Sequence, residues 1–142
     1  MLTIRELDSD HDLRTAFPLM AQLRDRITSA TFVDELRRQH ADGYRLIGGF
    51  ANERLVALAG IRHAHTLSRG PHLFVDDLVT DEREQGQGYG RELLASVEAL
   101  ASAAGLPRVY LDSRATAQGF YERVGYTFLT AIPCWKEVRR AS

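Results

Sequence analysis

The sequence has few features that would place the protein outside a reducing, aqueous compartment. It contains a single cysteine, Cys134, so no disulfide can form within the chain and a reducing environment is expected. No stretch approaches the roughly 20 apolar residues that a membrane-spanning helix needs. The N-terminal MLTIRELDSD carries acidic side chains and no long apolar run, which disfavours a signal peptide. We therefore expect a cytoplasmic protein.

An excess of charge of either sign is also lacking. Lys and Arg together number 18 and Asp and Glu number 19, which leaves a formal net charge of −1. A chain that binds nucleic acid or an anionic membrane by general electrostatics is usually strongly basic. We therefore expect neither nucleic acid nor a membrane as a partner.

Grouped metal ligands are the third absence. His63, His65 and His72 lie near one another in the sequence, but no set of Cys and His residues has the spacing of a metal site. Cys134 alone fits better as a small apolar residue of a C-terminal strand than as a reactive thiol. The expectation is a protein without a bound metal.

Two common phosphate-binding patterns are missing as well. A Walker-type loop requires a Lys followed by Ser or Thr after its second glycine, and neither dipeptide occurs. A dinucleotide fingerprint requires Gly-x-Gly-x-x-Gly, but the sixth position is Arg91 counted from Gly86 and Leu93 counted from Gly88. A nucleotide-binding module therefore stands third among the functions considered.

The chain does contain a continuous alternation of strand and helix patterns. Side-chain patterns predict strands over 2–7, 44–51, 55–65, 72–80 and 108–112, and a terminal strand pair over 127–131 and 134–139. Helical spacing predicts helices over 10–27, 31–41 and 115–123, and another that follows Gly90 and stops at Gly105. The order is β-α-α-β-β-β-α-β-α-β-β. It indicates one α/β (α+β) domain over residues 1–142, with a mixed sheet and helices on both faces.

A glycine-rich turn between the strand 72–80 and the following helix is the most informative feature. Gly86, Gly88 and Gly90 let the backbone approach a ligand closely and adopt positive φ. A helix that starts there leaves several N–H groups without intrahelical partners, which suits an anion such as phosphate. The turn predicts a phosphate-bearing cofactor, and the alternative is a flexible connection without a ligand.

The spacing Gln85-x-x-Gly88-x-Gly90, followed by Arg91-Glu92-Leu93-Leu94, resembles the acyl-CoA-binding motif of the GNAT superfamily of N-acetyltransferases. A shifted register, Arg83-x-x-Gly86-x-Gly88, also fits that pattern. The downstream Phe120-Tyr121 pair, with Gly125-Tyr126 and with Ala117 four residues before Tyr121, is similar to the family's second signature. The element order agrees too, so the resemblance covers nearly the whole chain. It implies a single-domain GNAT-like fold with a mixed, mostly antiparallel sheet.

The resemblance implies a set of cofactor contacts for acetyl-CoA as co-substrate. Backbone N–H groups around the turn would hold the pyrophosphate, and the last strand residues before it would pair with the pantetheine arm like an added strand. The second contact requires the sheet to splay after that strand. The implied residues are Leu78, Val79, Thr80, Gln85, Gly86, Gln87, Gly88, Tyr89, Gly90 and Arg91. Arg114 stands near the position where many members carry an Asn that helps to order the cofactor.

Acetyl transfer to an amine also needs an acid for the leaving thiolate and a base for the ammonium proton. Tyr121 is the candidate acid, because a phenol is protonated at neutral pH, and the alternative is a packing role beside Phe120. Asp76 and Asp77, within an otherwise apolar strand, are the candidate bases, and strand alternation predicts that they lie on opposite faces. Asp112 is a third candidate, and a water chain is another route. Equally, these acids could pair with arginines or cap the backbone.

The leading hypothesis is therefore an enzyme that moves an acetyl group from acetyl-CoA directly to a primary amine. The alternative from another class is a non-catalytic acyl-CoA-binding or sensing domain. The acceptor, a small molecule or a peptide amine, is left open by the sequence, and specificity is expected from residues 10–42 and 63–73. Oligomeric state is also open, with a homodimer among the alternatives because dimers are frequent in the resembled family.

Overall fold

The computed structural model describes residues 1–141, which separate into two compact units, Met1–Asp112 and a second that begins at Ser113. The first unit contains the sheet strands β1 (Thr3–Leu7), β2 (Arg45–Ala51), β3 (Arg54–Thr66), β4 (Gly70–Thr80) and β5 (Val109–Leu111). It also contains the helices α1 (Asp10–Leu23), α2 (Phe32–Ala41) and α3 (Tyr89–Ala103), and the 3-10 turn η1 (Glu82–Glu84). The second unit contains η2 (Ala115–Ala117) and α4 (Gln118–Arg123).

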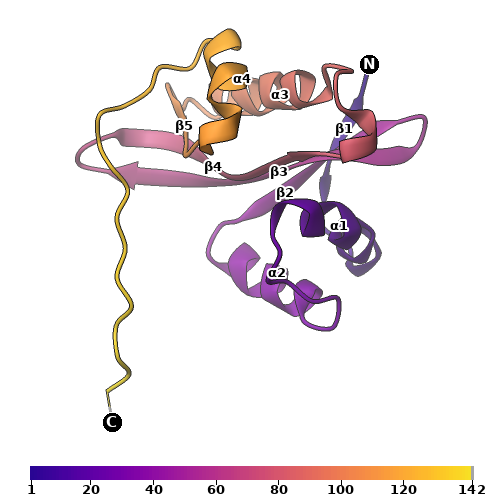
Figure 1. Cartoon of the computed structure of the whole chain (residues 1–142), viewed down its shortest axis with the longest axis horizontal. Helices are drawn as coiled ribbons and strands as arrows, with labels where there is room; N and C mark the ends of the chain where they lie inside the picture. Colours follow the sequence, from indigo (N-terminus) through magenta and orange to yellow (C-terminus); the bar gives the residue numbers. More distant parts are fainter. Residues whose placement is uncertain (142) are drawn as a thin grey trace. The chain divides into compact units, whose positions relative to one another are not determined.

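The five strands form one sheet in the order β1-β2-β3-β4-β5. Neighbours from β1 to β4 are antiparallel, and β4 and β5 are parallel. Within the first unit, α1 and α2 cover one face of this sheet and α3 covers the other (Figure 1). The predicted mixed, mostly antiparallel sheet with helices on both faces is therefore confirmed.

Each sheet face is buried by the apolar stripe of its helices. On one side, Leu13, Leu19 and Met20 of α1 and Leu36 of α2 pack over Leu46 and Leu58 of the sheet. On the other side, the buried residues of α3 are Leu93, Leu94, Val97 and Ala101. The residues of α3 recur at helical spacing, as the sequence predicts. A fully buried Leu or Val contributes about 1.5–3 kcal/mol relative to an exposed one, so these two stripes hold both helix layers on the sheet.

Strand β4 contains a β-bulge at Asp76. Gly60 of β3 lies opposite Asp77, whereas the next residue, Ile61, lies opposite Val75. Asp76 is therefore an extra residue in β4, and at a bulge the regular alternation of side chains between the two faces is interrupted.

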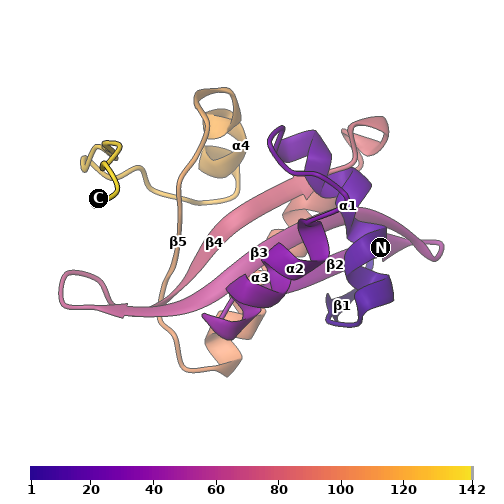
Figure 2. The same cartoon turned by 90° about the horizontal axis from the view of Figure 1, so that it is seen from below.

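The strands β4 and β5 pair over three residues only. Leu73–Val75 pairs with Val109–Leu111, and β5 ends there while β4 continues to Thr80 (Figure 2). Among the described residues, the segment from Asp76 to Thr80 is thus paired with β3 along one edge and with no strand along the other. The sheet opens at this point, as the resemblance requires.

Two sequence predictions about elements are wrong. The helix predicted over 10–27 ends at Leu23, because Arg24 adopts an extended conformation and bonds to β4, while Ile27 reaches the core from the following loop. The terminal strand pair predicted over 127–131 and 134–139 does not form among the described residues. Ile132, Trp135 and Val138 are 85 %, 84 % and 87 % exposed, so the alternating pattern there has no strand partner to cover it. No helix within residues 1–141 has the length and apolar character to cross a membrane.

Candidate functional site

The glycine turn presents a row of backbone N–H groups at the start of α3. Gly86 and Gly88 have φ of 84° and 80°, a region that favours glycine, and Gly88 is the N-cap residue of the helix. Because the first N–H groups of a helix lack intrahelical acceptors, those of Gly88, Tyr89, Gly90 and Arg91 are available to a ligand. With the helix dipole behind them, they suit the charge of a diphosphate.

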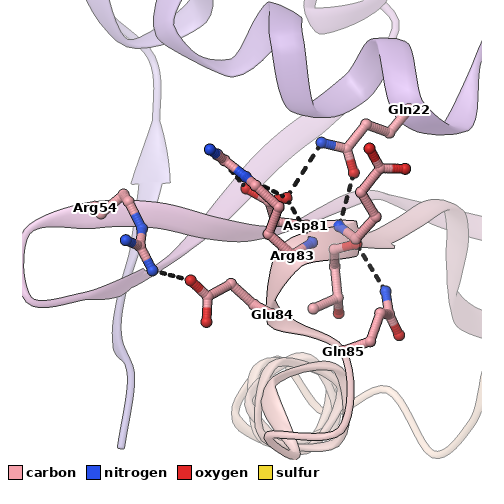
Figure 3. Close-up of polar contacts among 8 residues, drawn as sticks. Gln22, Arg54, Asp81, Arg83, Glu84 and Gln85 are labelled. Carbon is pink, nitrogen blue, oxygen red and sulfur yellow. Dashed lines mark hydrogen bonds and ion pairs between the residues drawn. The ribbon is translucent and has the colours of Figure 1, made fainter.

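The turn is anchored at its base by the buried carboxylate of Asp81, which is 4 % exposed (Figure 3). Asp81 accepts hydrogen bonds from the backbone N–H of Arg83 at 3.1 Å, from Arg83 Nη2 at 2.9 Å and from Gln22 Nε2 at 3.3 Å. The Arg83 guanidinium and backbone N–H hold the pKa of this carboxyl well below its usual range. Asp81 is therefore charged wherever the protein is folded near neutral pH.

Three further contacts fix the same turn from different elements. Gln22 of α1 accepts a hydrogen bond from the backbone N–H of Glu82 at 2.9 Å through its Oε1 atom. Gln85 donates from Nε2 to the carbonyl of Thr80 at 3.0 Å, so this side chain holds the turn against the end of β4. Arg54, at the start of β3, forms an ion pair with Glu84 (Figure 3). The turn is thus tied to α1, β3 and β4 together.

A free strand edge leads directly into this turn. Leu78, Val79 and Thr80 pair with β3 through Ala59, Leu58 and Ala57, and their other edge faces no strand within the described part of the chain. All three are half-buried. Their N–H and C=O groups can accept an extended amide-containing ligand as an added strand, and such a ligand would end at the turn's N–H groups.

A cavity of about 1000 Å³ lies beside the bulge, between the α1–α2 segment and the sheet. Its lining includes acidic and basic side chains in equal number, together with several apolar side chains. Its lining residues are Met20, Arg24, Arg26, Ile27, Thr31, Phe32, Glu35, Leu36, Arg38, Gln39, Asp42, Tyr44, Arg62, Asp76 and Asp77. The region 10–42, from which the sequence predicts acceptor specificity, supplies most of this lining; the segment 63–73 supplies none.

Asp77 is held in this cavity by two side chains. Tyr44 donates its hydroxyl to Oδ2 at 2.7 Å, and Arg24 donates from Nε to Oδ1 at 2.8 Å. Burial, and then the Asp77 charge, raise the pKa of the Tyr44 phenol far above its usual value, so it stays a hydrogen-bond donor. Gly60, directly opposite Asp77, makes room for that hydroxyl, which a Cβ at position 60 would overlap.

Asp76 is engaged by a different arginine. Arg62 donates from Nε and Nη2 to the two carboxylate oxygens at 2.6 and 3.0 Å, and its guanidinium lies 5.1 Å from the centre of the Phe74 ring. Asp76 and Asp77 both line the cavity, so the prediction that they face opposite sides is wrong. The bulge is the reason, because it inserts one residue into the alternation. The alternative of pairing with arginines is confirmed for Asp76 and Asp77.

Tyr121 lies in the second unit, on α4, and is 8 % exposed. Its ring packs edge-on against Phe120 at 5.1 Å and Tyr126 at 5.8 Å between centroids. Burial raises the pKa of its phenol, which keeps the proton in place at neutral pH. Both parts of the prediction are therefore compatible with this position: Tyr121 is packed beside Phe120 and is also a protonated phenol. Asp112 is exposed at the end of the first unit.

Sequence reasoning misses several residues of the site. Tyr44 and Arg62 have the pattern of ordinary strand residues and Gln22 that of an exposed helix residue, yet they bond to Asp77, Asp76 and Asp81. Their partners are distant in the chain, so no local pattern signals them. Asp81 is different, because an Asp side chain often accepts a hydrogen bond from the backbone N–H two residues later, here that of Arg83. This local pattern is a turn signal that the sequence could have revealed. No group of three or more potential metal ligands occurs within residues 1–141.

The chain is similar to known proteins in sequence and in fold. The profile of the Acetyltransferase (GNAT) family matches residues 10–126. An uncharacterized N-acetyltransferase of Bacillus subtilis (strain 168), YhdJ, is 30 % identical over 132 residues, covering 89 % of this chain and 93 % of the relative. The structure of glucosamine-6-phosphate N-acetyltransferase from Arabidopsis thaliana has a TM-score of 0.76 at 22 % identity, covering 98 % of this chain and 99 % of the other. The aminoglycoside N-acetyltransferase AAC(6')-Iy, solved in complex with CoA, has a TM-score of 0.82 at 15 % identity, covering 96 % and 95 %.

Proposed function

The chain belongs to the GNAT acetyltransferase family, and from this premise we propose that it transfers an acetyl group from acetyl-CoA to a primary amine by direct attack. The observation that carries the proposal is the free edge of β4 that runs into the glycine turn. Leu78–Thr80 offers backbone groups to the pantetheine amides, and the N–H groups from Gly86 to Arg91 offer donors to the pyrophosphate. The CoA complex of the structural neighbour supports the same donor.

In this proposal the acceptor amine reaches the donor from the cavity beside the bulge. Bound acetyl-CoA supplies the thioester carbonyl; the amine nitrogen forms a bond to that carbon and the carbon–sulfur bond breaks. Asp76 or Asp77 takes the ammonium proton, directly or through water, before the amine attacks. Tyr121 gives its proton to the departing thiolate, and the second proton that the nitrogen loses as the amide forms returns to Tyr121 through water. Burial raises the pKa of Tyr121, which supports its role as a proton donor.

The ion pairs around the acidic residues shape which of them can act. Asp76 uses both oxygens on Arg62, and Asp77 uses one on Arg24 and the other on Tyr44. Arg24 bonds one oxygen of Asp77, whereas Arg62 bonds both oxygens of Asp76, so Arg24 is the partner that an incoming ammonium can displace at the smaller cost. We therefore assign the base to Asp77 ahead of Asp76, with water as the connection where the amine does not reach it.

The test is turnover of a panel of primary amines, including amino sugars, polyamines and peptides, with the acetylated product identified by mass spectrometry. Cys134 is exposed and open to thiol reagents, so assays of released CoA thiol should use a Cys134→Ser variant to remove this background. Acetylated amine that forms only with acetyl-CoA and enzyme together supports the proposal. Absence of acetyl-CoA binding by calorimetry would refute it.

A non-catalytic acyl-CoA sensor is the second candidate, and the arginine pairs favour it because both candidate bases are occupied in the described structure. A Tyr121→Phe variant separates the two functions. For the enzyme, it should bind acetyl-CoA like the parent but turn over at least about 100-fold more slowly, within the usual range for a lost general acid. Tight acetyl-CoA binding by the parent without turnover of any amine would favour the sensor.

The remaining properties belong to the same proposal. The two compact units act together as one N-acetyltransferase domain over residues 1–142, supported by a family match that spans both. The single cysteine supports a reducing, cytoplasmic location, and the balanced charge supports a small-molecule or peptide partner over nucleic acid or a membrane. The protein works without a metal, and sedimentation would decide between a monomer and a homodimer.

A further inference from the structure

The last turn of α1 and the residue that follows the helix contact the glycine turn and the acceptor cavity. Gln22 bonds to Asp81 and Glu82 at the base of the turn. Two residues later, Arg24 bonds to the Asp77 carboxylate and to the Asp76 carbonyl at the bulge. The end of this helix is therefore placed by contacts to the two halves of the candidate site.

The contact of Gln22 with the turn uses both ends of its amide. The Nε2 atom donates to Asp81 Oδ1 at 3.3 Å, while the Oε1 atom accepts from the Glu82 N–H at 2.9 Å (Figure 3). A carboxylate or a hydrocarbon at this position could make at most one of these two bonds. The match of donor and acceptor is therefore specific to an amide.

Asp81 receives its hydrogen bonds from inside the turn and from α1. It accepts from the N–H and the side chain of Arg83 as well as from Gln22, and its own N–H donates to the Val56 carbonyl of β3 at 2.8 Å. An unpaired carboxylate buried to this extent would be costly, so the bonds keep residues 81–84 in one conformation. Neither side chain needs to touch the cofactor to have this effect.

We propose that Gln22 and Asp81 are positioning residues, which hold the base of the glycine turn so that its N–H groups are oriented for the diphosphate before acetyl-CoA binds. This inference rests on the proposed function and assigns it two residues outside the recognised motifs. A turn that is already ordered does not have to lose that conformational freedom on binding, so affinity is gained without new contacts. Loosening the base weakens acetyl-CoA binding and leaves the chemical step at saturating acetyl-CoA unchanged.

The experiment measures acetyl-CoA affinity by calorimetry and kcat at saturating acetyl-CoA for the parent, Q22E, D81N and the double variant Q22E/D81N. Q22E keeps the acceptor for the Glu82 N–H but places a second carboxylate beside Asp81, and should raise Kd by about tenfold. In the double variant an asparagine amide can donate to Glu at position 22. It should therefore bind more tightly than Q22E alone, whereas independent effects would make it weaker than either.

Asp12→Asn is the matched control, because Asp12 is also a carboxylate in a two-bond pair with an arginine, Arg5, and lies at the other end of α1. Its variant should lose stability without a change in the Kd for acetyl-CoA. If D81N fails to fold, Gln22→Met on the helix surface removes both hydrogen bonds without a charge and should raise Kd less than Q22E does.

The outcomes separate the two proposals. A parent that does not bind acetyl-CoA overturns the proposed function and this inference with it. A parent that binds, with a Q22E variant of equal Kd or a double variant weaker than Q22E, overturns only the positioning role. A fall in kcat with unchanged Kd also overturns it, because positioning of the turn acts on binding.

Discussion

At the scale of single residues, the position of Asp77 depends on a glycine that no motif includes. Gly60 lies opposite Asp77 in the sheet, and the Tyr44 hydroxyl occupies the space where its Cβ would be. Tyr44 is buried, so neither its ring nor its hydroxyl can move aside without disturbing the core. The sequence shows a glycine within a strand, which often marks a close approach, but not what approaches it.

Gly60→Ala is therefore expected to lower the free energy of unfolding by about 1–3 kcal/mol, as overpacking of a core typically does. Urea unfolding measures the change. Gly119→Ala is the control, because its Cβ would meet only the end of the Arg123 side chain, at 3.2 Å, and alanine favours the helix. Equal stability of Gly60→Ala and the parent would show that Tyr44 does not occupy this space.

Asp81 should contribute a defined part of the acid sensitivity of the fold. Folding lowers the pKa of the Asp81 carboxyl. The charged carboxylate therefore stabilises the fold at pH values above about 3.9, the pKa of an Asp in the unfolded chain. That contribution is lost as the pH falls below this value toward the folded pKa.

An Asp81→Asn variant should be less stable than the parent near neutral pH, and the difference should shrink as the pH falls below about 4. Urea midpoints across this range measure it. Asp25→Asn is the control, since Asp25 is exposed and makes no ion pair among the described residues. A difference that stays constant with pH would contradict the role given to Asp81.

At the scale of elements, α3 lies between two glycines, and only the first of them belongs to the proposed cofactor site. Gly88 begins the helix with φ of 80° and Gly105 follows its end with φ of 73°. A Cβ added to either glycine would have no atom within 4 Å, its chain neighbours aside, so neither position is crowded. The conformational demand on the two glycines is thus nearly the same. Only the first lies among the N–H groups proposed to hold the diphosphate.

Gly88→Ala and Gly105→Ala should each destabilise the protein by about 1–2 kcal/mol, the usual cost of a left-handed conformation for a residue with a Cβ. Thermal or urea unfolding measures this. Calorimetry with acetyl-CoA should then show weaker binding for Gly88→Ala alone. If both variants bind like the parent, or both bind equally weakly, the turn is not the specific cofactor site.

At the scale of the whole molecule, the described chain divides into a sheet-containing unit and a smaller one that carries Tyr121 and a segment without regular structure. The family match ends at Tyr126, just before that segment. Exposed apolar side chains, including Trp135 and Val138, follow it. Segments of backbone without regular hydrogen bonding are usually the first to be cleaved by a protease.

Limited digestion with trypsin should therefore cut first at Lys136, Arg139 or Arg140, which are exposed and lie in this segment. Mass spectrometry of early time points identifies the order of cleavage. Arg24 and Arg62 are the internal comparison, since each is engaged in an ion pair with β4. Cleavage at either of these before the C-terminal sites would contradict the expected order of stability.

The parts of the site that the sequence predicts are formed by residues close together in the chain, whereas the parts that it does not predict depend on contacts between distant segments. The glycine turn is predictable because its residues are consecutive and the φ demands of Gly86 and Gly88 are local. The faces of Asp76 and Asp77 are predicted wrongly because a bulge depends on how β3 pairs with β4, which neither strand's own pattern reveals. The C-terminal strands are predicted from alternation alone, and alternation cannot supply the partner strand.

Local periodicity and motifs of adjacent residues are enough to predict the order of the elements as far as α4, the mixed α/β class and the family. The folded chain was needed to show that β4 leaves β5 after Val75, that two neighbouring carboxylates share one cavity, and that Gln22 bonds to Asp81 at the turn. These features arise where chain segments far apart in sequence meet. Their energies come from pairing, burial and hydrogen bonding between those segments, which exist only once the chain has folded.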